Sequence, residues 1–215
     1  MEEHLNKIIC ADSLDFMKSL PDKCIDLVLT DPPYGINADK GSNFFGHTGG
    51  REYNDSWDNQ TPPSETFDEI LRISKNAIIF GGQFFTDKLP TNGHWIVWDK
   101  KGGIDFDNPF GDCELAWTNI ERKSVKKYTV IQQGFVSEEK ERFHPTQKPV
   151  KLMEYILRDY TEEGATVLDC FLGSGTTALA CKLLGRNYIG IEKEQKYVDI
   201  AIDRIKAIDA QPNLF

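Results

Sequence analysis

Short runs of apolar residues alternate along the chain with longer segments in which apolar residues recur every three or four positions. Most of the short runs end at or just before a glycine or an acidic residue. Buried strands of a parallel sheet have this character because both of their faces are covered. The strand candidates are residues 25–30, 77–80, 166–169 and 188–192 and, with more aromatic content, residues 94–98 and 114–117.

The segments between these runs have the spacing of helices that bury one face. The first such helix is expected to begin at Ser64, as its N-cap, and to continue to Ile73. Further helices are expected over residues 150–160, 176–184 and 197–205. Strands that alternate with helices predict an α/β fold with a mainly parallel sheet.

A chain of 215 residues can bury a full core, so we expect a single domain over residues 1–215. Residues 37–60 are rich in glycine, asparagine and aspartate and lack periodicity, which predicts a mobile loop. No apolar stretch is long enough to span a bilayer, and the N-terminus is acidic where a secretion signal would be basic. The expected location is therefore the cytoplasm, with no membrane partner.

The chain has five cysteines, an odd number, and none of them forms a CxxC pair. This pattern is typical of reduced thiols in a cytoplasmic protein. It argues against a disulfide framework and against a zinc site, so no metal is expected. The five are Cys10, Cys24, Cys113, Cys170 and Cys181.

The formal net charge of -9 is unfavourable for an enzyme that acts on nucleic acid, because phosphate contacts require local positive charge. One segment nevertheless concentrates basic residues: Arg122, Lys123, Lys126 and Lys127. Such a run is either the solvated tip of a hairpin or a phosphate-binding surface, and charge alone does not separate the two.

A glycine-rich turn lies between the strand at 166–169 and the helix at 176–184. Gly173 and Gly175 allow the backbone of this turn to approach a ligand closely. Glu192 ends the next strand, about twenty residues further on, where a carboxylate can accept hydrogen bonds from both hydroxyls of a ribose. The spacing suits any adenosine-containing ligand, nicotinamide dinucleotides included, and a purely structural turn is the alternative. No lysine follows Gly175, which argues against a phosphate-binding P-loop.

The position of this turn in the chain carries further information. A dinucleotide-binding fold usually begins with such a unit and continues with several βα repeats. Here one strand and one helix follow the turn, so the other strands must come from the N-terminal part of the chain. The sheet is therefore expected to be permuted, which argues against an NAD-dependent oxidoreductase.

A second turn, Asp31-Pro32-Pro33-Tyr34, ends the buried strand at 25–30. Ligands of open parallel sheets bind outside the carboxyl ends of the strands. The two prolines fix the backbone and leave the Pro32 carbonyl free to accept a hydrogen bond. A carboxylate and that carbonyl can both accept from one exocyclic amine, and Tyr34 offers a ring for stacking on a flat base. An amine held in this way is oriented for in-line attack on a methyl group.

These motifs together resemble the β group of amino-group DNA methyltransferases, which use S-adenosylmethionine (SAM) and place the catalytic motif before the cofactor glycines. The segments 144–149 and 187–192, with Tyr197, Ala201 and Arg204, match the family as well. The resemblance covers nearly the whole chain. It implies a Rossmann-like class I methyltransferase fold with a circularly permuted, mainly parallel sheet and helices on both faces.

The resemblance also implies roles for individual residues. Asp31 and the Pro32 carbonyl would hold the target amine, Pro33 would complete the rigid turn, and Tyr34 would stack on the flipped base. Asp31 would also lie beside the cofactor. The remaining cofactor-binding residues would be Ala11, Asp12, Thr146, Lys148, Phe171, Gly173, Ser174, Gly175, Thr176 and Glu192.

Asp-Pro-Pro-Tyr occurs in the family mostly in enzymes that methylate adenine N6, and Ser-Pro-Pro-Tyr in those that methylate cytosine N4. The resemblance therefore implies a site-specific adenine-N6 DNA methyltransferase, with N4-cytosine methylation as the alternative. An RNA adenine methyltransferase and an inactive nucleic-acid-binding paralogue are more distant alternatives. None of the five cysteines follows a proline, which argues against C5-cytosine methylation.

The expected partner is double-stranded DNA of a bacterium or phage, with the target base flipped out of the helix. Residues 100–142 are the expected target-recognition segment. They include the basic run, and Arg51 in the early loop is a further candidate for DNA contact. The family also suggests a homodimer and a cognate restriction enzyme as partners.

Overall fold

The computed structural model describes residues 1–36, 58–104, 111–122, 124–132, 143 and 146–210. The predicted loop at 37–60 therefore lies outside the described residues except for its last three positions. Arg51 and Lys123, both proposed to contact DNA, lie outside them too.

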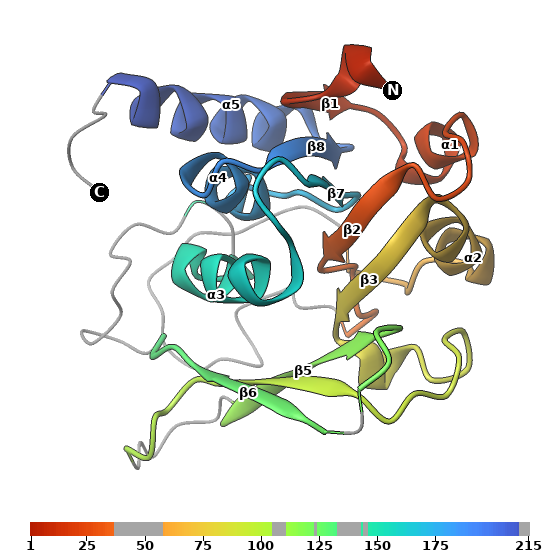
Figure 1. Cartoon of the computed structure of the whole chain (residues 1–215), viewed down its shortest axis with the longest axis vertical. Coiled ribbons are helices and arrows are strands. Elements are labelled where there is room, and N and C mark those ends of the chain that lie inside the picture. Colours follow the sequence, from red (N-terminus) through yellow and green to blue (C-terminus); the bar gives the residue numbers. More distant parts are fainter. Residues whose placement is uncertain (37–57, 105–110, 123, 133–142, 144–145, 211–215) are drawn as a thin grey trace.

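The described residues form one eight-stranded sheet with the strand order β1-β8-β7-β2-β3-β5-β4-β6 (Figure 1). The five strands from β1 to β3 pair in parallel, β5 is antiparallel to both of its neighbours, and β4 pairs with β6 in parallel. The strands are β1 (Lys7–Cys10), β2 (Ile25–Thr30), β3 (Ser74–Phe80), β4 (Trp95–Asp99), β5 (Cys113–Thr118), β6 (Lys126–Thr129), β7 (Thr166–Asp169) and β8 (Asn187–Glu192).

Helices cover both faces of the sheet. One face carries α1 and α2, and the other carries α3, α4 and α5 (Figure 1). The helices are α1 (Ser13–Lys18), α2 (Ser64–Ile73), α3 (Val150–Tyr160), α4 (Thr176–Leu183) and α5 (Gln195–Ala210), with 3-10 turns η1 (Glu2–His4) and η3 (Gly82–Phe84). This arrangement is the predicted Rossmann-like fold with a permuted, mainly parallel sheet.

The alternation of side chains along the central strands explains the two layers. Along β2, Val28 packs toward α1 and α2, whereas Leu29 packs toward α3 and α4, and both are fully buried. Ile79 and Ile78 repeat this division on β3. Because both faces of these strands are covered, they are apolar at nearly every position.

Most of the predicted elements are confirmed, some to the residue. The bounds of β2, β7 and α3 agree with the prediction, and β3 begins three residues earlier, at Ser74. The expected N-cap was wrong: Ser64 is the first helical residue and Pro63 is the N-cap, without a side-chain hydrogen bond. Three elements were not predicted, namely β1, α1 and β6. Among the described residues no helix is both long and apolar enough to cross a membrane.

Truncation of a central side chain should destabilise the fold measurably. Ile78 is fully buried on β3, so Ile78→Ala is expected to lower the free energy of unfolding by about 2–5 kcal/mol. Val125 is 58% exposed, so Val125→Ala is the matched control and should change it by less than about 0.5 kcal/mol. Urea denaturation followed by circular dichroism measures both. Equal effects of the two substitutions would contradict the described packing.

Candidate active site

The two predicted motifs lie next to each other because their strands are neighbours. β2 pairs in parallel with β7, with Leu27 opposite Val167 and Val28 opposite Leu168. Asp31 follows the carboxyl end of β2 and Phe171 follows that of β7. Parallel strands bring both ends to the same edge of the sheet, where α/β proteins bind their ligands.

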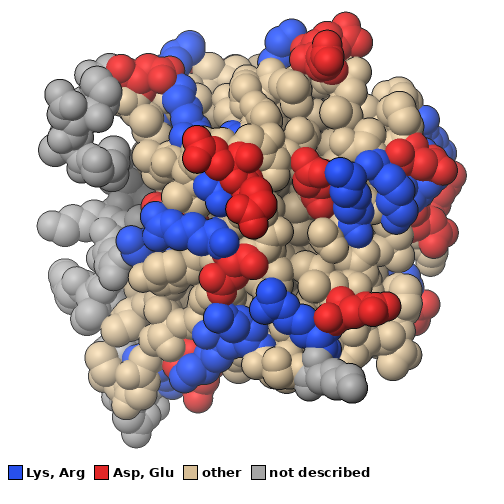
Figure 2. All heavy atoms as spheres, in the orientation of Figure 1, with Lys and Arg blue, Asp and Glu red and all other residues tan. Residues whose placement is uncertain are grey.

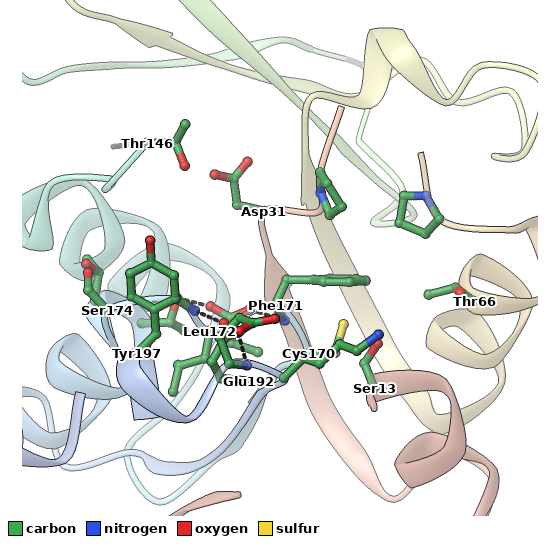
Figure 3. A pocket seen from close by; sticks show the side chains of 18 of the residues that line it. Ser13, Asp31, Thr66, Thr146, Cys170, Phe171, Leu172, Ser174, Glu192 and Tyr197 are labelled. Carbon is green, nitrogen blue, oxygen red and sulfur yellow. Dashed lines mark hydrogen bonds between the residues drawn. The ribbon is translucent and has the colours of Figure 1, made fainter. Parts of the chain in front are cut away.

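A cavity of about 630 Å³ opens at this edge, a size typical of small-molecule sites. Figure 3 shows Asp31 and Thr146 above Phe171 and Glu192 in the close-up view. Residues from both halves of the chain line the cavity. The predicted cofactor residues among them are Ala11, Asp12, Asp31, Thr146, Lys148, Phe171, Gly173, Ser174, Thr176 and Glu192, and the predicted catalytic residue Pro33 joins them.

Three predicted residues do not line the cavity: Pro32, Tyr34 and Gly175. Gly175 precedes α4 with φ +89, and a Cβ there would lie 2.7 Å from the Ala201 Cβ on α5. This glycine therefore serves the close packing of the turn against α5. Gly173, with φ +53, does line the cavity, as the ligand-approach interpretation requires.

Glu192 holds the glycine turn from the end of β8. Its Oε2 accepts a hydrogen bond from the Gly173 N–H at 2.8 Å, and its Oε1 accepts one from the Glu194 N–H at 2.9 Å. Burial raises the pKa of this carboxyl, although the two N–H donors oppose the shift. Each oxygen keeps a further lone pair, so a ligand hydroxyl can still bind there.

Asp169, the last residue of β7, fixes the base of the same turn. Its Oδ1 accepts from the Thr30 hydroxyl at 2.7 Å and from the Phe171 N–H at 3.1 Å. Its Oδ2 accepts from the Thr177 hydroxyl at 2.7 Å. Burial raises the pKa of Asp169 to about 6 despite these donors. The side chain thus ties the strand that leads to Asp31 to the start of α4.

Asp31 is the predicted catalytic carboxylate, and both of its oxygens have protein partners. The Tyr34 hydroxyl donates to Oδ1 at 2.5 Å, and the Lys148 ammonium donates to Oδ2. Burial raises the pKa of Asp31, and the positive charge of Lys148 opposes that shift. The Tyr34 ring stacks on Phe84, with ring centroids 4.9 Å apart, and Gly81 leaves room for it, since a Cβ there would overlap the ring.

Lys148 is a buried cation between two carboxylates. Its side chain is 6% exposed, and its Nζ pairs with Asp31 and lies 3.2 Å from Glu114 Oε2 on β5. Burial alone would lower the pKa of Lys148, but the two carboxylates outweigh it and raise the pKa. Lys148 was predicted to contact the cofactor. The structure shows it lining the cavity and paired with Asp31.

Gln147 connects this segment to the glycine turn. Its Oε1 accepts from the Ser174 hydroxyl at 3.1 Å and from the Phe143 N–H at 3.0 Å, and its carbonyl accepts from Gln132 Nε2 at 2.9 Å. Arg204 on α5 also donates to the Ser174 carbonyl, at 2.7 Å. The segment before α3 and helix α5 therefore both hold the glycine turn through Ser174.

Sequence reasoning missed three parts of this site. Glu114 was predicted only as a strand residue, and nothing in the local sequence marks its pairing with Lys148. Gln147 lies inside the recognised segment 144–149, which could have suggested it. Residues at the start of α2 and beyond the glycine turn also line the cavity, namely Pro62, Pro63, Thr66 and Tyr197.

The described part of the basic run lies on and beside β6, at the edge of the sheet. Lys126 pairs with Asp159 and Lys127 with Asp99, both at 3.0 Å, and the Arg122 guanidinium lies 5.0 Å from the centre of the Tyr160 ring. Figure 2 shows basic and acidic side chains side by side over the face that it presents. The run is therefore partly neutralised by its own surroundings.

The described residues contain no group of three or more metal-ligating side chains. Cys170 and Cys181 are buried, and all five cysteines are free thiols.

Comparisons with known proteins agree with this architecture. Residues 97–203 match the family model described as DNA methylase. The Type II methyltransferase M.HinfI of Haemophilus influenzae is 28% identical over an alignment that covers 99% of this chain and 72% of that protein. The Type II methyltransferase M.HpaI of Haemophilus parainfluenzae is 27% identical, with 93% of this chain and 74% of that protein covered.

Solved structures show the same fold. The M1.HpyAVI–SAM complex superposes with a TM-score of 0.59 at 26% identity, over 93% of this chain and 98% of that one. The PvuII DNA methyltransferase, described as cytosine-N4-specific, gives a TM-score of 0.62 at 17% identity, over 92% of this chain and 85% of that one.

The family model covers the cofactor half of the chain, and the relatives extend the match to the half that contains Asp31. Taken with the permuted sheet and the shared cavity, these matches show that the chain belongs to the amino-group DNA methyltransferase family.

Proposed function

We propose that this protein is a site-specific DNA methyltransferase that transfers a methyl group from SAM to the N6 amine of a flipped adenine. One observation carries the proposal: the Asp31 turn and the glycine turn end neighbouring parallel strands and line one cavity. Thr30 and Asp169, which precede the two turns, are 139 residues apart in the sequence. Their side chains nevertheless form a hydrogen bond, so the fold joins the two turns at one edge of the sheet.

The cavity suits SAM in size and in chemistry. Glu192 presents a half-buried carboxylate for ribose hydroxyls beside the Gly173 backbone. Ala11 and Asp12 line the cavity near the end of β1, where the adenine ring would lie. Thr146 lies on the Asp31 side, where the methionyl part of the cofactor would be closest to the target amine. When bound, SAM supplies an electrophilic methyl group on a sulfonium centre.

The residues of the chain position the amine. Asp31 is held in one orientation by the Tyr34 hydroxyl and by Lys148, and its remaining lone pairs can accept from an amine N–H. The neighbouring prolines fix the backbone, and the Pro32 carbonyl is the proposed acceptor for the other N–H, although Pro32 itself does not line the cavity. Two acceptors on one amine direct its nitrogen lone pair away from them, toward the cofactor side of the cavity.

The choice of adenine rests on the Asp31 side chain. In this family an aspartate at that position accompanies adenine methylation more often than cytosine methylation. N4-cytosine methylation is the second candidate, because both bases present an exocyclic amine of the same chemistry. The likeness to the cytosine-N4-specific PvuII enzyme, at 17% identity, concerns the fold alone.

DNA is expected to bind beside the cavity through residues 100–142, with the base flipped into the site at a cost of a few kcal/mol. Within that segment, Arg122, Lys126 and Lys127 are the described basic residues that we propose for phosphate contact. Arg51 and Lys123 complete that set. A homodimer and a cognate restriction enzyme remain predictions that the family suggests.

Expression in a host without its own methyltransferases tests the function directly. Nucleoside mass spectrometry of the host DNA should reveal N6-methyladenine. N4-methylcytosine in its place would overturn the choice of base and keep the reaction class. Unmodified DNA from cells that contain folded protein would contradict DNA as the substrate.

Asp31→Ala should abolish methyl transfer and leave cofactor binding largely intact, because the side chain holds the amine of the target. Transfer of radiolabelled methyl groups to DNA measures the first effect, and calorimetric binding of S-adenosylhomocysteine measures the second. Loss of cofactor binding alone would contradict the assigned role of Asp31.

Glu192→Ala should weaken binding of S-adenosylhomocysteine by about 1.5–3 kcal/mol, the contribution of a hydrogen bond to a charged group. This corresponds to roughly a 10- to 150-fold higher Kd. Asp199→Ala is the matched control, because that carboxylate accepts from Gln195 on the exposed part of α5. An unchanged Kd for Glu192→Ala would place the ribose partner elsewhere.

Substitution of Lys126 and Lys127 by alanine should weaken DNA binding and reduce the slope of log K against log salt by about 2, since each phosphate contact contributes about 0.9. The control is Lys18→Ala with Lys75→Ala. These lysines pair with Glu65 and Asp26, and neither lysine lines the cavity. An equal loss in both double variants would show that net charge alone acts.

A further inference from the structure

Four charged side chains of alternating sign form a continuous chain that begins at the cavity wall and leads away from it. Asp31 pairs with Lys148, Lys148 lies 3.2 Å from Glu114, and Glu114 pairs with Lys100. The members come from the turn after β2, the segment before α3, strand β5 and the residue after β4. The chain thus links the catalytic turn to the outer hairpin of the sheet.

The chain is largely withdrawn from water. The side chains of Asp31, Lys148, Glu114 and Lys100 are 18%, 6%, 23% and 18% exposed. Charges are costly to bury unless they are paired. One carboxylate would suffice to neutralise Lys148, and here two share it.

The second carboxylate is not held by Lys148 through a well-formed hydrogen bond. Among the described residues, Glu114 Oε2 has no hydrogen bond of good geometry, and the Lys148 ammonium lies 3.2 Å from it as an ion pair. Lys100 anchors the other oxygen of Glu114 and lies 5.0 Å from the centre of the Trp98 ring. Lys100 therefore holds one carboxylate oxygen of Glu114, and the other oxygen points toward Lys148.

We propose that Glu114 is a positioning residue for methyl transfer, which shares Lys148 with Asp31 so that the ammonium orients the catalytic carboxylate without neutralising it. The inference rests on the proposed function of Asp31 as the acceptor for the target amine. It assigns a role in the reaction to Glu114, a residue that does not line the cavity.

The charge balance supports this role. With Lys100 included, the four charged side chains are formally neutral, and without Glu114 the remaining three would carry a net charge of +1. An amine that gains a methyl group becomes positively charged as the bond forms. A set of fixed charges with a net charge of +1 beside the amine would oppose that charge, whereas the balanced set that includes Glu114 does not.

The charge of each neighbour determines whether it raises or lowers the pKa of Asp31. Burial raises the pKa of Asp31, Lys148 lowers it, and Glu114 raises it through like-charge repulsion. Tyr34 donates to Asp31 from its own turn, and Asp169 faces it from β7 as a further acidic group. Removal of Glu114 should therefore lower the pKa of Asp31, and removal of Lys148 should raise it.

The test compares Glu114→Gln, Lys148→Met and Lys100→Met with the wild-type protein. The pKa of Asp31 is measured by NMR, from the pH dependence of its carboxyl ¹³C signal in protein labelled with ¹³C-aspartate. That signal is assigned as the one missing from the spectrum of Asp31→Asn. The pKa of Asp31 should fall in Glu114→Gln and rise in Lys148→Met. It should also rise in Lys100→Met, which leaves Glu114 without its outer partner. Asp112→Asn, which removes a nearby carboxylate paired with Lys101, is the control and should leave the titration unchanged.

Kinetics supply the second readout. Glu114→Gln should reduce kcat roughly ten- to hundredfold, since small misplacements of a catalytic group cost this much, with little change in the Kd for S-adenosylhomocysteine. Activity requires ionised Asp31, so the acidic limb of kcat against pH should move to lower pH in Glu114→Gln. It should move to higher pH in Lys148→Met and Lys100→Met.

An unchanged titration of Asp31 in Glu114→Gln would overturn the inference, as would a kcat equal to that of the wild type. If Lys148→Met does not fold, the opposite shifts of Glu114→Gln and Lys100→Met still decide the question. A wild-type protein that transfers no methyl group would overturn the proposed function instead. The NMR titration would then still show whether Glu114 and Lys148 set the charge of Asp31.

Discussion

The parallel pairing of β2 with β7 is the constraint on which the rest of the site depends. It joins the N-terminal and C-terminal halves of the chain in the middle of the sheet, and the Thr30–Asp169 hydrogen bond of 2.7 Å ties the two strand ends. Closing so long a loop costs entropy, although this cost grows only slowly with loop length. The fully buried residues of β2 and β7 on both faces of the sheet offset it. The pairing brings the Asp31 turn and the glycine turn to the same edge of the sheet, where both line one cavity.

The site that results concentrates charge where the fold would otherwise exclude it. Burial raises the pKa of Asp31 and Glu192, and that of Asp169 to about 6. Hydroxyls, backbone N–H groups and Lys148 oppose these upward shifts of the pKa. Raised carboxyl pKa values in the folded state cost stability at neutral pH, because ionisation is easier in the unfolded chain. Lys148 recovers part of that cost, and its own pKa is raised in return. The carboxylates that cost folding stability thus lie at the edge of the sheet where ligands bind, and functional sites commonly carry such a cost.

The bounds of an element could be predicted from the sequence where its pattern of apolar residues matches its burial in the fold. The apolar run of β2 and the amphipathic α3 are visible from spacing alone, and both were placed to the residue. β1 and β6 escaped prediction because each is a four-residue edge strand with a mixed burial pattern, so periodicity carries little signal there. The cavity residues that belong to motifs could be predicted, because the motif fixes their place relative to a strand end. Glu114 could not, since its pairing with Lys148 depends on how β5 packs beside β3, a contact between segments that no local pattern encodes.

A net charge of -9 does not prevent DNA binding, because the ion pairs that the surface lysines form within the protein are weak. Lys126 and Lys127 are 43% and 62% exposed, and each already has a carboxylate partner. Exposed pairs of this kind contribute only about 0–1 kcal/mol, so exchanging a carboxylate for a phosphate costs little. Phosphate contact also releases counterions from the DNA, a gain that the internal pair cannot provide. Paired lysines at a sheet edge can therefore serve DNA binding in an acidic protein, because their internal partners shield them in the free protein and release them at small cost.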